Sequence, residues 1–323
     1  VTKSIENRRF FSDKPTKMRL DIPNKWGYTV EKRNSVFRKG ILLMNSSRPG
    51  SGMLYDMHNH SLHSHDAKSD IAALCEIAIQ SNIAGFAVTD HFDNEYSKET
   101  DTFSSIAASF KDAGEKQKLY GEKVDIIRGV EIGEGIWFPE EAEKMISLCD
   151  FDVVLGSVHA VRYKNLTAPY SVIDFSKVSK ADVTGFWGAY FDDLAACAET
   201  MDYDILTHLT CPLRYINGKF GYSLSPETHA DKIESILKTV ISRGKALEIN
   251  TSCLGSHYDE LMPGKFILER YYALGGQLVT VGSDSHIEPN FAKGLEKAVG
   301  ILKEIGFDKA YYYKKRKAYA YTL

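Results

Sequence analysis

The 323-residue chain lacks the features that mark several classes of protein. Its five cysteines are odd in number, widely spaced and without a C-x-x-C pair, which argues against a disulfide framework and favours reduced thiols in the cytoplasm. The longest apolar run near the start, residues 41–44, is too short for a signal peptide or a membrane span. A net charge of −3 gives no reason to expect a nucleic-acid or membrane partner. We therefore expect a cytoplasmic globular protein.

Charge is nevertheless distributed unevenly along the chain. Residues 1–52 contain six Lys and six Arg against four acidic residues, so this segment carries +8 and the remainder −11. A basic extension of this kind is either an interaction arm or a solvated flank, and the sequence leaves its structure open. The Arg-Pro-Gly-Ser-Gly stretch at 48–52 is typical of a linker. We therefore divide the chain into a basic N-terminal extension, 1–52, and a body, 53–323.

The body alternates short apolar runs with longer helical patterns. Strands are expected at 53–58, 84–89, 124–131, 152–158, 203–208, 245–250 and 277–283. Helices are expected at about 69–82, 101–120, 139–148, 183–200, 227–243, 263–275 and 290–305. Seven strands, each followed by a helix, predict a parallel sheet that is either closed as a barrel or open and doubly wound. The long insertion at about 160–182 is typical of a functional lid, and the tyrosine-rich tail 309–323 is expected to form an edge hairpin or a terminal strand.

Metal-binding side chains recur where the expected strands end. The first strand runs into His58 and His60, whose side chains fall on one face of an extended chain. Six histidines and three carboxylates follow the strands in this way: His58, His60, Asp66, His91, Glu131, His159, His208, Asp284 and His286. In parallel α/β folds the active site lies at that edge. Nine ligands exceed what one ion takes and predict two or three divalent ions, with Zn, Fe or Mn favoured over Ca or Mg.

This pattern resembles the polymerase-and-histidinol-phosphatase (PHP) family of metal-dependent phosphoesterases. The nine side chains carry the resemblance, and they extend over residues 58–286. Within the family, the Leu-Gly-Ser-Val-His run at 155–159, the insertion after it, and the Glu-Ile-Asn-Thr-Ser run at 248–252 are most similar to monofunctional histidinol-phosphate phosphatases. The resemblance implies a distorted (β/α)7 barrel of the TIM type, with its metal site at the C-terminal ends of the strands.

The resemblance also implies a trinuclear arrangement. One ion would be held by His58, His60, Glu131 and Asp284. Glu131 would bridge to a second ion held by His159 and His208, and a third would be held by Asp66, His91 and His286. His65 adjoins Asp66 and either could fill that position; we prefer Asp66 because it lies six residues after His60, as in the family. We expect Glu131, Asp284 and His159 to be catalytic as well.

The implied chemistry is hydrolysis of a phosphate monoester by a metal-bridging hydroxide, with the ions neutralising the phosphoryl oxygens. Arg162 and Arg214 lie three and six residues after ligand histidines and are candidate substrate ligands, since a guanidinium fork matches two phosphate oxygens. A surface role is equally expected for each arginine. Asn250 is a third candidate for binding substrate, although polar residues at strand ends are as often structural.

The leading hypothesis is hydrolysis of L-histidinol phosphate to L-histidinol and phosphate in histidine biosynthesis, with this small phosphorylated molecule as the partner. The main alternative is another PHP phosphoesterase, acting on nucleotides or phosphotyrosine protein; a nuclease would be expected to carry basic charge at its groove, whereas the body is acidic. An amidohydrolase also begins with His-x-His but uses a carbamylated Lys where this chain has His159. A metal-binding module without activity would predict missing ligands, yet all nine are present. Nothing in the sequence sets an oligomeric state.

Overall fold

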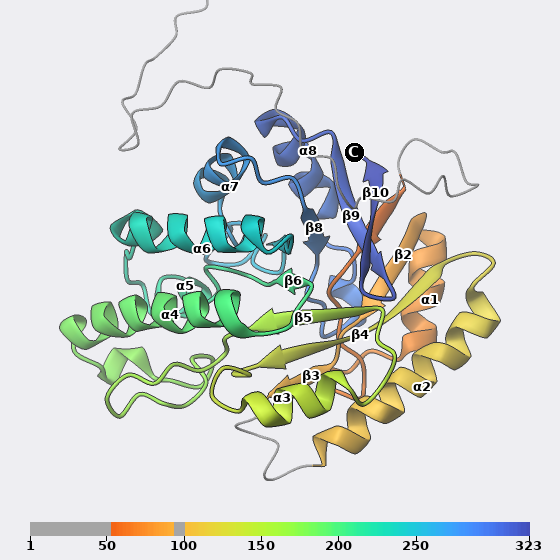
Figure 1. Ribbon diagram of the computed structural model, residues 1–323, viewed down its shortest axis with the longest axis horizontal. Coiled ribbons are helices and arrows are strands. Elements are labelled where there is room, and N and C mark those ends of the chain that lie inside the picture. Colours follow the sequence, from red (N-terminus) through yellow and green to blue (C-terminus); the bar gives the residue numbers. More distant parts are fainter. Residues whose placement is uncertain (1–52, 94–100) are drawn as a thin grey trace, which may run out of the picture. The chain divides into compact units, whose positions relative to one another are not determined.

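The computed structural model describes residues 53–93 and 101–323, so the predictions for 1–52 lie outside the described residues. Its centre is a parallel sheet (Figure 1) whose neighbouring strands are β1 (Leu54–Asp56), β2 (Ile83–Val88), β4 (Asp125–Gly133), β5 (Val153–Ser157), β6 (Ile205–Leu206), β7 (Ala246–Asn250) and β8 (Val279–Gly282). These strands fall within or beside the seven predicted segments. A further short strand, β3 (His91–Asp93), also pairs with β4 and was absent from the prediction.

The two ends of this sheet meet and nearly close it into a barrel. The amide of Met57, just after β1, donates to the carbonyl of Val281 in β8 at 2.8 Å. Two residues further on, Asn59 and Ser285 form a parallel bridge. These contacts decide between the two predicted topologies, and the expected distorted TIM-like barrel of α/β class is confirmed.

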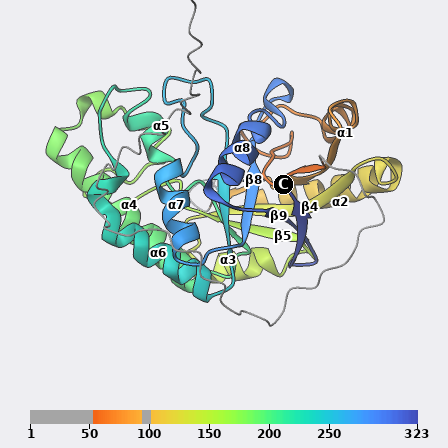
Figure 2. The same cartoon turned by 90° about the horizontal axis from the view of Figure 1, so that it is seen from above.

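Helices surround the strands (Figure 2) and correspond to the seven predicted helical segments. They are α1 (Ile71–Gln80), α2 (Thr102–Tyr120), α3 (Pro139–Ile146), α4 (Lys180–Thr200), α6 (Ala230–Ser242), α7 (Lys265–Ala273) and α8 (Leu295–Ile305), and a short α5 (Pro212–Ile216) was not predicted. Helix α4 begins earlier than expected because the Ser179 hydroxyl caps it, accepting from the Asp182 amide at 3.1 Å. No helix in the described ranges is both long and apolar enough to cross a bilayer.

Two hydrophobic layers hold the barrel together. Inward-facing side chains fill the space enclosed by the strands, with Met57, Ile127, Val153 and Leu155 among the buried residues. A larger layer packs the outer faces of the strands against the helices. A barrel filled in this way is a packed core and not a pore, so its chemistry belongs to the strand ends.

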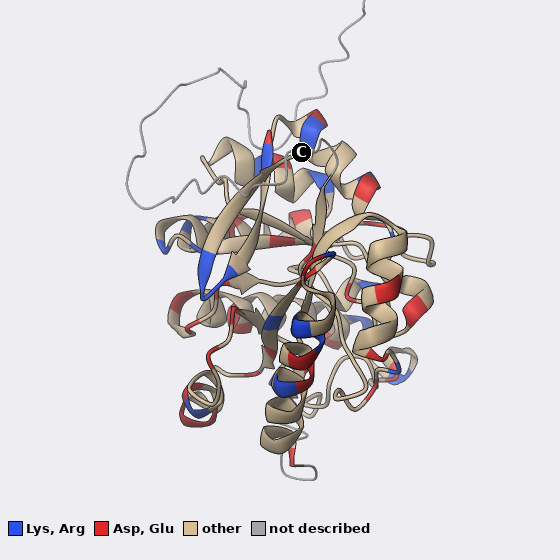
Figure 3. Ribbon diagram, turned by 90° about the vertical axis from the view of Figure 1, so that its right-hand side faces the viewer, with Lys and Arg blue, Asp and Glu red and all other residues tan. Residues whose placement is uncertain are grey.

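The tyrosine-rich tail forms the hairpin that was one of the two predicted outcomes, with strands β9 (Lys309–Lys314) and β10 (Lys317–Thr322). It contacts residues at the starts of barrel strands. The Lys315 amide donates to Asp152 just before β5 at 3.0 Å, and the Tyr312 ring stacks on that of Tyr55 with centroids 4.1 Å apart. Basic residues gather at the hairpin turn (Figure 3). The hairpin therefore covers the amino ends of the strands and leaves their carboxyl ends for the site.

Candidate metal centre

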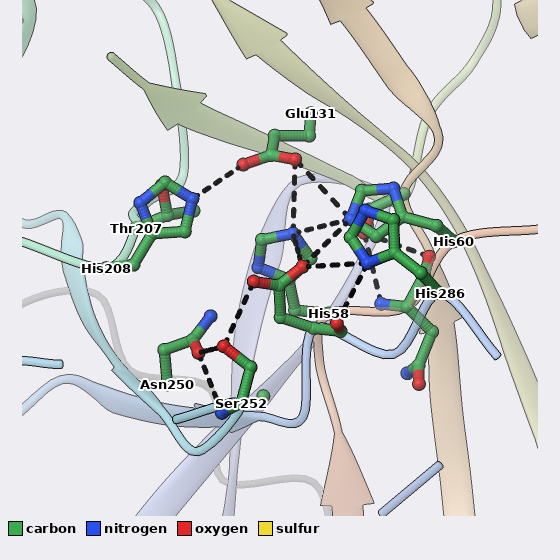
Figure 4. Close-up of polar contacts among 12 residues, drawn as sticks. His58, His60, Glu131, Thr207, His208, Asn250, Ser252 and His286 are labelled. Carbon is green, nitrogen blue, oxygen red and sulfur yellow. Dashed lines mark hydrogen bonds and ion pairs between the residues drawn. The ribbon is translucent and has the colours of Figure 1, made fainter. Parts of the chain in front are cut away.

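All nine predicted metal-binding side chains converge at the carboxyl ends of the strands. Figure 4 shows five of them: His58, His60, Glu131, His208 and His286. His58 and His60 follow β1, Glu131 lies within β4, and His208 follows β6. Parallel register explains the convergence, because each strand delivers its last side chains to the same edge. His58, His60 and Glu131 are completely buried, so their polar atoms depend on one another or on bound ions.

The first group is His58, His60 and Asp284. The Nε2 atoms of the two histidines face each other at 3.1 Å, and Asp284 Oδ1 lies 3.3 Å from that of His60. Asp284 has a φ of 51°, a left-handed backbone conformation that residues other than glycine seldom adopt. Such backbone conformations persist where the surrounding structure enforces them, and they cluster at functional sites.

The second group is His159, His208 and Glu131. The two Nε2 atoms are 3.3 Å apart. Glu131 Oε1 lies 3.2 Å from the Nε2 atom of His159 and 3.0 Å from that of His208. The carboxylate thus completes a triangle of three possible ligand atoms that come from the ends of β4, β5 and β6.

The third group is His91, His286 and Asp66. The Nε2 atoms of the two histidines are 3.3 Å apart, and Asp66 Oδ2 lies 3.3 Å from His286 Nε2. Asp66 Oδ1 lies 3.8 Å from His91 Nε2. His65, the alternative to Asp66, places its ring 5.7 Å from the His91 ring between centroids. The geometry thus favours Asp66 over its neighbour as a member of the group.

Glu131 connects these groups. Its Oε1 contacts the second group, whereas its Oε2 contacts the other two. Oε2 lies 3.2 Å from His58 Nε2 of the first group and 3.0 Å from His91 Nδ1 of the third group. Yet this buried Oε2 accepts no hydrogen bond of normal geometry from any described residue. Oxygen and nitrogen atoms packed closely without hydrogen bonds are expected where a cation is the common partner.

The spacing of the facing histidines fits this interpretation. Two imidazole nitrogens bound to one tetrahedral zinc, each at about 2.0–2.1 Å, lie about 3.3 Å apart. The three facing pairs measure 3.1, 3.3 and 3.3 Å. The residues present therefore suit divalent transition metals in both chemistry and spacing.

The electrostatics of the centre favour cations. Burial opposes ionisation of Glu131, yet the imidazoles of His58 and His159 hold its pKa well below its ordinary value. Burial likewise opposes protonation of His58, but the carboxylates of Glu131 and Glu248 raise its pKa well above the ordinary value. Burial together with the nearby His91 imidazole lowers the pKa of His60 to about 3. The carboxylates are thus charged, and cations can replace the protons they share with the histidines.

Two carboxylates behind the centre orient its histidines, and sequence reasoning did not assign them that role. Glu248 Oε1 lies 2.6 Å from His58 Nδ1, and its other oxygen accepts from the His208 amide at 2.8 Å. Asp93 Oδ1 lies 2.8 Å from His159 Nδ1. Glu248 stands at the end of a predicted strand, so its place was visible in the sequence, whereas Asp93 lies on the unpredicted β3.

The three predicted substrate ligands occupy different surroundings. Arg214 Nη1 lies 3.8 Å from Asp284 Oδ2, beside the first group. Arg162 is exposed, and its guanidinium lies 4.3 Å from the Trp137 ring centroid. Asn250 is buried and accepts from the Ser252 hydroxyl at 2.7 Å (Figure 4). Of the three candidates, Arg214 therefore lies beside a predicted metal ligand. Arg162 contacts an aromatic side chain instead, and Asn250 is hydrogen-bonded to Ser252.

Two adjoining cavities open onto the centre. The larger, of about 190 Å³, is lined by Asp66, Arg214, Tyr215, Ser252, Ser283, Asp284, His286, Asn290 and Lys293. The smaller, of about 100 Å³, has among its lining residues His91, Asp93, His159, Pro169, Tyr170, His208, Arg214 and Tyr215. Arg214 and Tyr215 line both cavities. The predicted insertion contributes Pro169 and Tyr170, so part of it does reach the site.

Fold and site together define an α/β-barrel protein with a cluster of histidines and carboxylates, able to hold metal ions, at the carboxyl ends of its strands. Residues 56–252 match the model of the PHP domain, and the chain belongs to the PHP family. This confirms the resemblance carried by the nine side chains.

Relatives and solved structures agree with that assignment. A probable histidinol-phosphatase of Clostridium acetobutylicum is 30% identical over 274 residues, covering 83% of this chain and 100% of the relative. A probable histidinol-phosphatase of Thermotoga maritima is 30% identical over 79% of this chain and 94% of the relative. The crystal structure of a histidinol phosphate phosphatase from Lactococcus lactis, complexed with Zn, L-histidinol and phosphate, aligns with a TM-score of 0.67 and 23% identity over 82% of this chain and 98% of that chain. At that identity the structural likeness supports the fold.

Proposed function

We propose that the protein is a metal-dependent phosphomonoesterase that hydrolyses L-histidinol phosphate to L-histidinol and phosphate, as a step of histidine biosynthesis. The observation that carries the proposal is the set of three facing histidine pairs joined by Glu131. Similarity to relatives named histidinol-phosphatase over nearly their whole length supports the choice of substrate.

Each histidine pair, in this proposal, holds one divalent ion of Zn, Fe or Mn. Asp284 completes the group of His58 and His60, Asp66 that of His91 and His286, and Glu131 that of His159 and His208 while also facing the first group. Ions bound there would neutralise phosphoryl oxygens and acidify a water that attacks phosphorus. Glu131, Asp284 and His159 are the catalytic ligands in this scheme. Asp284 and His159 line the cavities beside the centre, and the buried Glu131 contacts histidines of all three groups.

Arg214 is the candidate for fixing the phosphoryl group from the protein side. It lines both cavities beside the ligand Asp284. Burial opposes its charge, but neighbouring Tyr215 and Asp284 raise its pKa above the ordinary value, so it stays cationic. A guanidinium here can donate two parallel hydrogen bonds to phosphate oxygens. Asn250 acts less directly, by holding the Ser252 hydroxyl, which lies 3.3 Å from Asp284 Oδ2.

The walls of the smaller cavity suit the organic part of histidinol phosphate. Tyr170 is buried, and its ring lies 5.6 Å from that of Tyr215 between centroids. Aromatic side chains and Pro169 offer flat apolar surface to an imidazole ring. Asp93 lines the same cavity, where its carboxylate contacts His159 Nδ1 at 2.8 Å.

A substrate comparison tests the proposal. Purified protein loaded with Zn or Mn is assayed for phosphate release from L-histidinol phosphate, nucleoside monophosphates and a phosphotyrosine peptide under the same conditions. We expect the highest kcat/KM for L-histidinol phosphate. Equal or higher values for a nucleotide or the peptide would reject the substrate assignment while leaving the phosphoesterase chemistry in place.

We also propose a cytoplasmic location. All five cysteines are free thiols, and four of them are buried. Free thiols are typical of a reducing compartment. Fractionation of cells that express the full-length protein tests this directly.

A further inference from the structure

Asp93, a carboxylate that is not among the nine predicted metal ligands, lies on β3 beside the end of β4. In the β3–β4 register, Asp93 stands opposite Gly133 and His91 stands opposite Glu131. Residues two apart on a strand point to the same side. Asp93 and Gly133 therefore lie on the side of the sheet that carries the metal-binding residues.

Asp93 makes its shortest contact with a candidate ligand. Its Oδ1 lies 2.8 Å from His159 Nδ1, and Oδ2 lies 3.6 Å from His91 Nδ1. The carboxylate is buried, with 5% of its surface exposed, so few competing water contacts are open to it. An ionised carboxylate only accepts hydrogen bonds, so Nδ1 of His159 must carry the proton. A metal ion would then bind through Nε2 of the same ring, once that atom has released its own proton, and Nε2 faces Glu131 and His208.

Gly133 makes this approach possible. A Cβ atom at position 133 would lie 2.2 Å from Asp93 Oδ1 and 3.1 Å from His159 Nδ1. Such distances are shorter than van der Waals contact, so any larger residue would force the carboxylate and the imidazole apart. The next residue, Glu134, accepts from the backbone amides of His159 at 2.5 Å and Ala160 at 2.8 Å. The β4 end thus fixes both the side chain and the backbone of His159.

We propose that Asp93 is a positioning residue that orients His159 for metal binding, and that Gly133 is required because it leaves room for the Asp93–His159 contact. The inference rests on the proposed metal centre but not on the identity of the substrate. Carboxylates that accept from the second nitrogen of a ligand histidine fix its tautomer and ring orientation, and removing them typically lowers metal affinity by about 10- to 100-fold.

The test measures metal binding and catalysis separately. Asp93→Asn, Asp93→Ala and Gly133→Ala are compared with the wild type by competition titration of Zn²⁺ against a chromophoric chelator, and by the visible spectrum of the Co²⁺-substituted protein. We expect Asp93→Asn to weaken one class of metal site by about 10- to 100-fold and to change its Co²⁺ spectrum. kcat for the fastest-turned-over phosphate ester should fall more than KM rises. Unchanged affinity and spectrum would overturn the proposal, whatever the substrate proves to be.

The double variant distinguishes positioning from general loss of packing. Gly133→Ala should weaken the same site in the wild type and cost less in the Asp93→Ala background. There the carboxylate 2.2 Å from the new Cβ is gone, and only the 3.1 Å approach to His159 Nδ1 remains. Equal losses in both backgrounds would contradict the coupling. Asp204→Asn is the matched control: this buried Asp accepts from the Val154 amide at 2.8 Å near the amino end of the barrel. It should lower the thermal midpoint and leave metal affinity unchanged. A loss of affinity as large as that of Asp93→Asn would overturn the proposal, because the effect would then follow from general destabilisation.

Discussion

His58 Nδ1 lies 2.6 Å from Glu248 Oε1, although 190 residues separate the two in the chain. The contact passes beside Gly282 on the intervening strand β8, where a Cβ atom would lie 2.6 Å from both Glu248 Oε1 and His58 Cβ. The same carboxylate accepts from the His208 amide. Glu248 therefore connects two histidines of different groups, and the barrel closure between β8 and β1 brings the first of them into reach.

Glu248→Gln should weaken metal binding without unfolding the protein. The amide keeps the size of the side chain but removes the negative charge that favours an Nδ1–H on His58, so the ring loses its preferred tautomer. We expect retained metal after dialysis to fall, and kcat with it. Glu248→Ala should also lower the free energy of unfolding by about 1–3 kcal/mol, because the buried His208 amide loses its acceptor.

Glu234→Gln is the control for the two Glu248 variants. Glu234 also holds two partners, Arg270 at 2.6 Å and Lys238 at 2.7 Å, but it belongs to helix α6 on the outside of the barrel. It should leave metal content unchanged. Metal analysis by inductively coupled plasma mass spectrometry checks both variants, and full metal retention in Glu248→Gln would contradict the assigned role.

Arg214→Met should lower kcat/KM more than Arg162→Met. Arg214 lines both cavities next to Asp284, whereas the Arg162 guanidinium lies over Trp137. A lost hydrogen bond to a charged group is worth about 1.5–3 kcal/mol, so the Arg214 variant should lose about 10- to 100-fold. Steady-state kinetics with L-histidinol phosphate measure the difference. An equal loss at Arg162 would show that this side chain leaves Trp137 when substrate binds.

Much of this architecture could be predicted because it follows from local patterns. Buried parallel strands require apolar runs, and a metal centre at their ends requires His, Asp or Glu directly after those runs, so His58 and His208 could be located without a structure. Strand β3 was not predicted because its three residues, His-Phe-Asp, contain a single apolar side chain. The role of Asp93, which lies on that strand, was therefore missed as well.

Side-chain direction after the strand ends was the part that local pattern could not supply. Arg162 and Arg214 each follow a ligand histidine within six residues, yet tertiary packing places one over Trp137 and the other, on the unpredicted helix α5, beside Asp284. The choice between His65 and Asp66 is of the same kind, since neighbouring residues on an irregular segment point in unrelated directions. The spacing from His60 in the family already favoured Asp66, and the contacts of its carboxylate with His91 and His286 agree with that choice.

The hairpin contact gives a prediction about stability alone. Tyr312 stacks on Tyr55 at 4.1 Å between centroids, at the end of the barrel opposite the metal centre. Tyr312→Ala removes the stacking, worth about 0.5–1.5 kcal/mol beyond the buried area. Urea unfolding should show a lower free energy of unfolding, while metal content and KM stay at wild-type values. A change in KM would mean that the two ends of the barrel are coupled.

Metal binding should release protons, and the pKa directions give its pH dependence. Burial opposes protonation of His91, but the Asp93 and Glu131 carboxylates raise its pKa in the metal-free protein to about 9. At neutral pH this imidazole is therefore protonated, and an ion must displace the proton. Affinity should then rise as pH increases from neutrality and level off above about 9. His60, with a pKa lowered to about 3, is already neutral and releases none. Isothermal titration of the chelator-treated protein with Zn²⁺, in buffers of different ionisation enthalpy, counts the released protons; a count of zero at neutral pH would contradict the prediction.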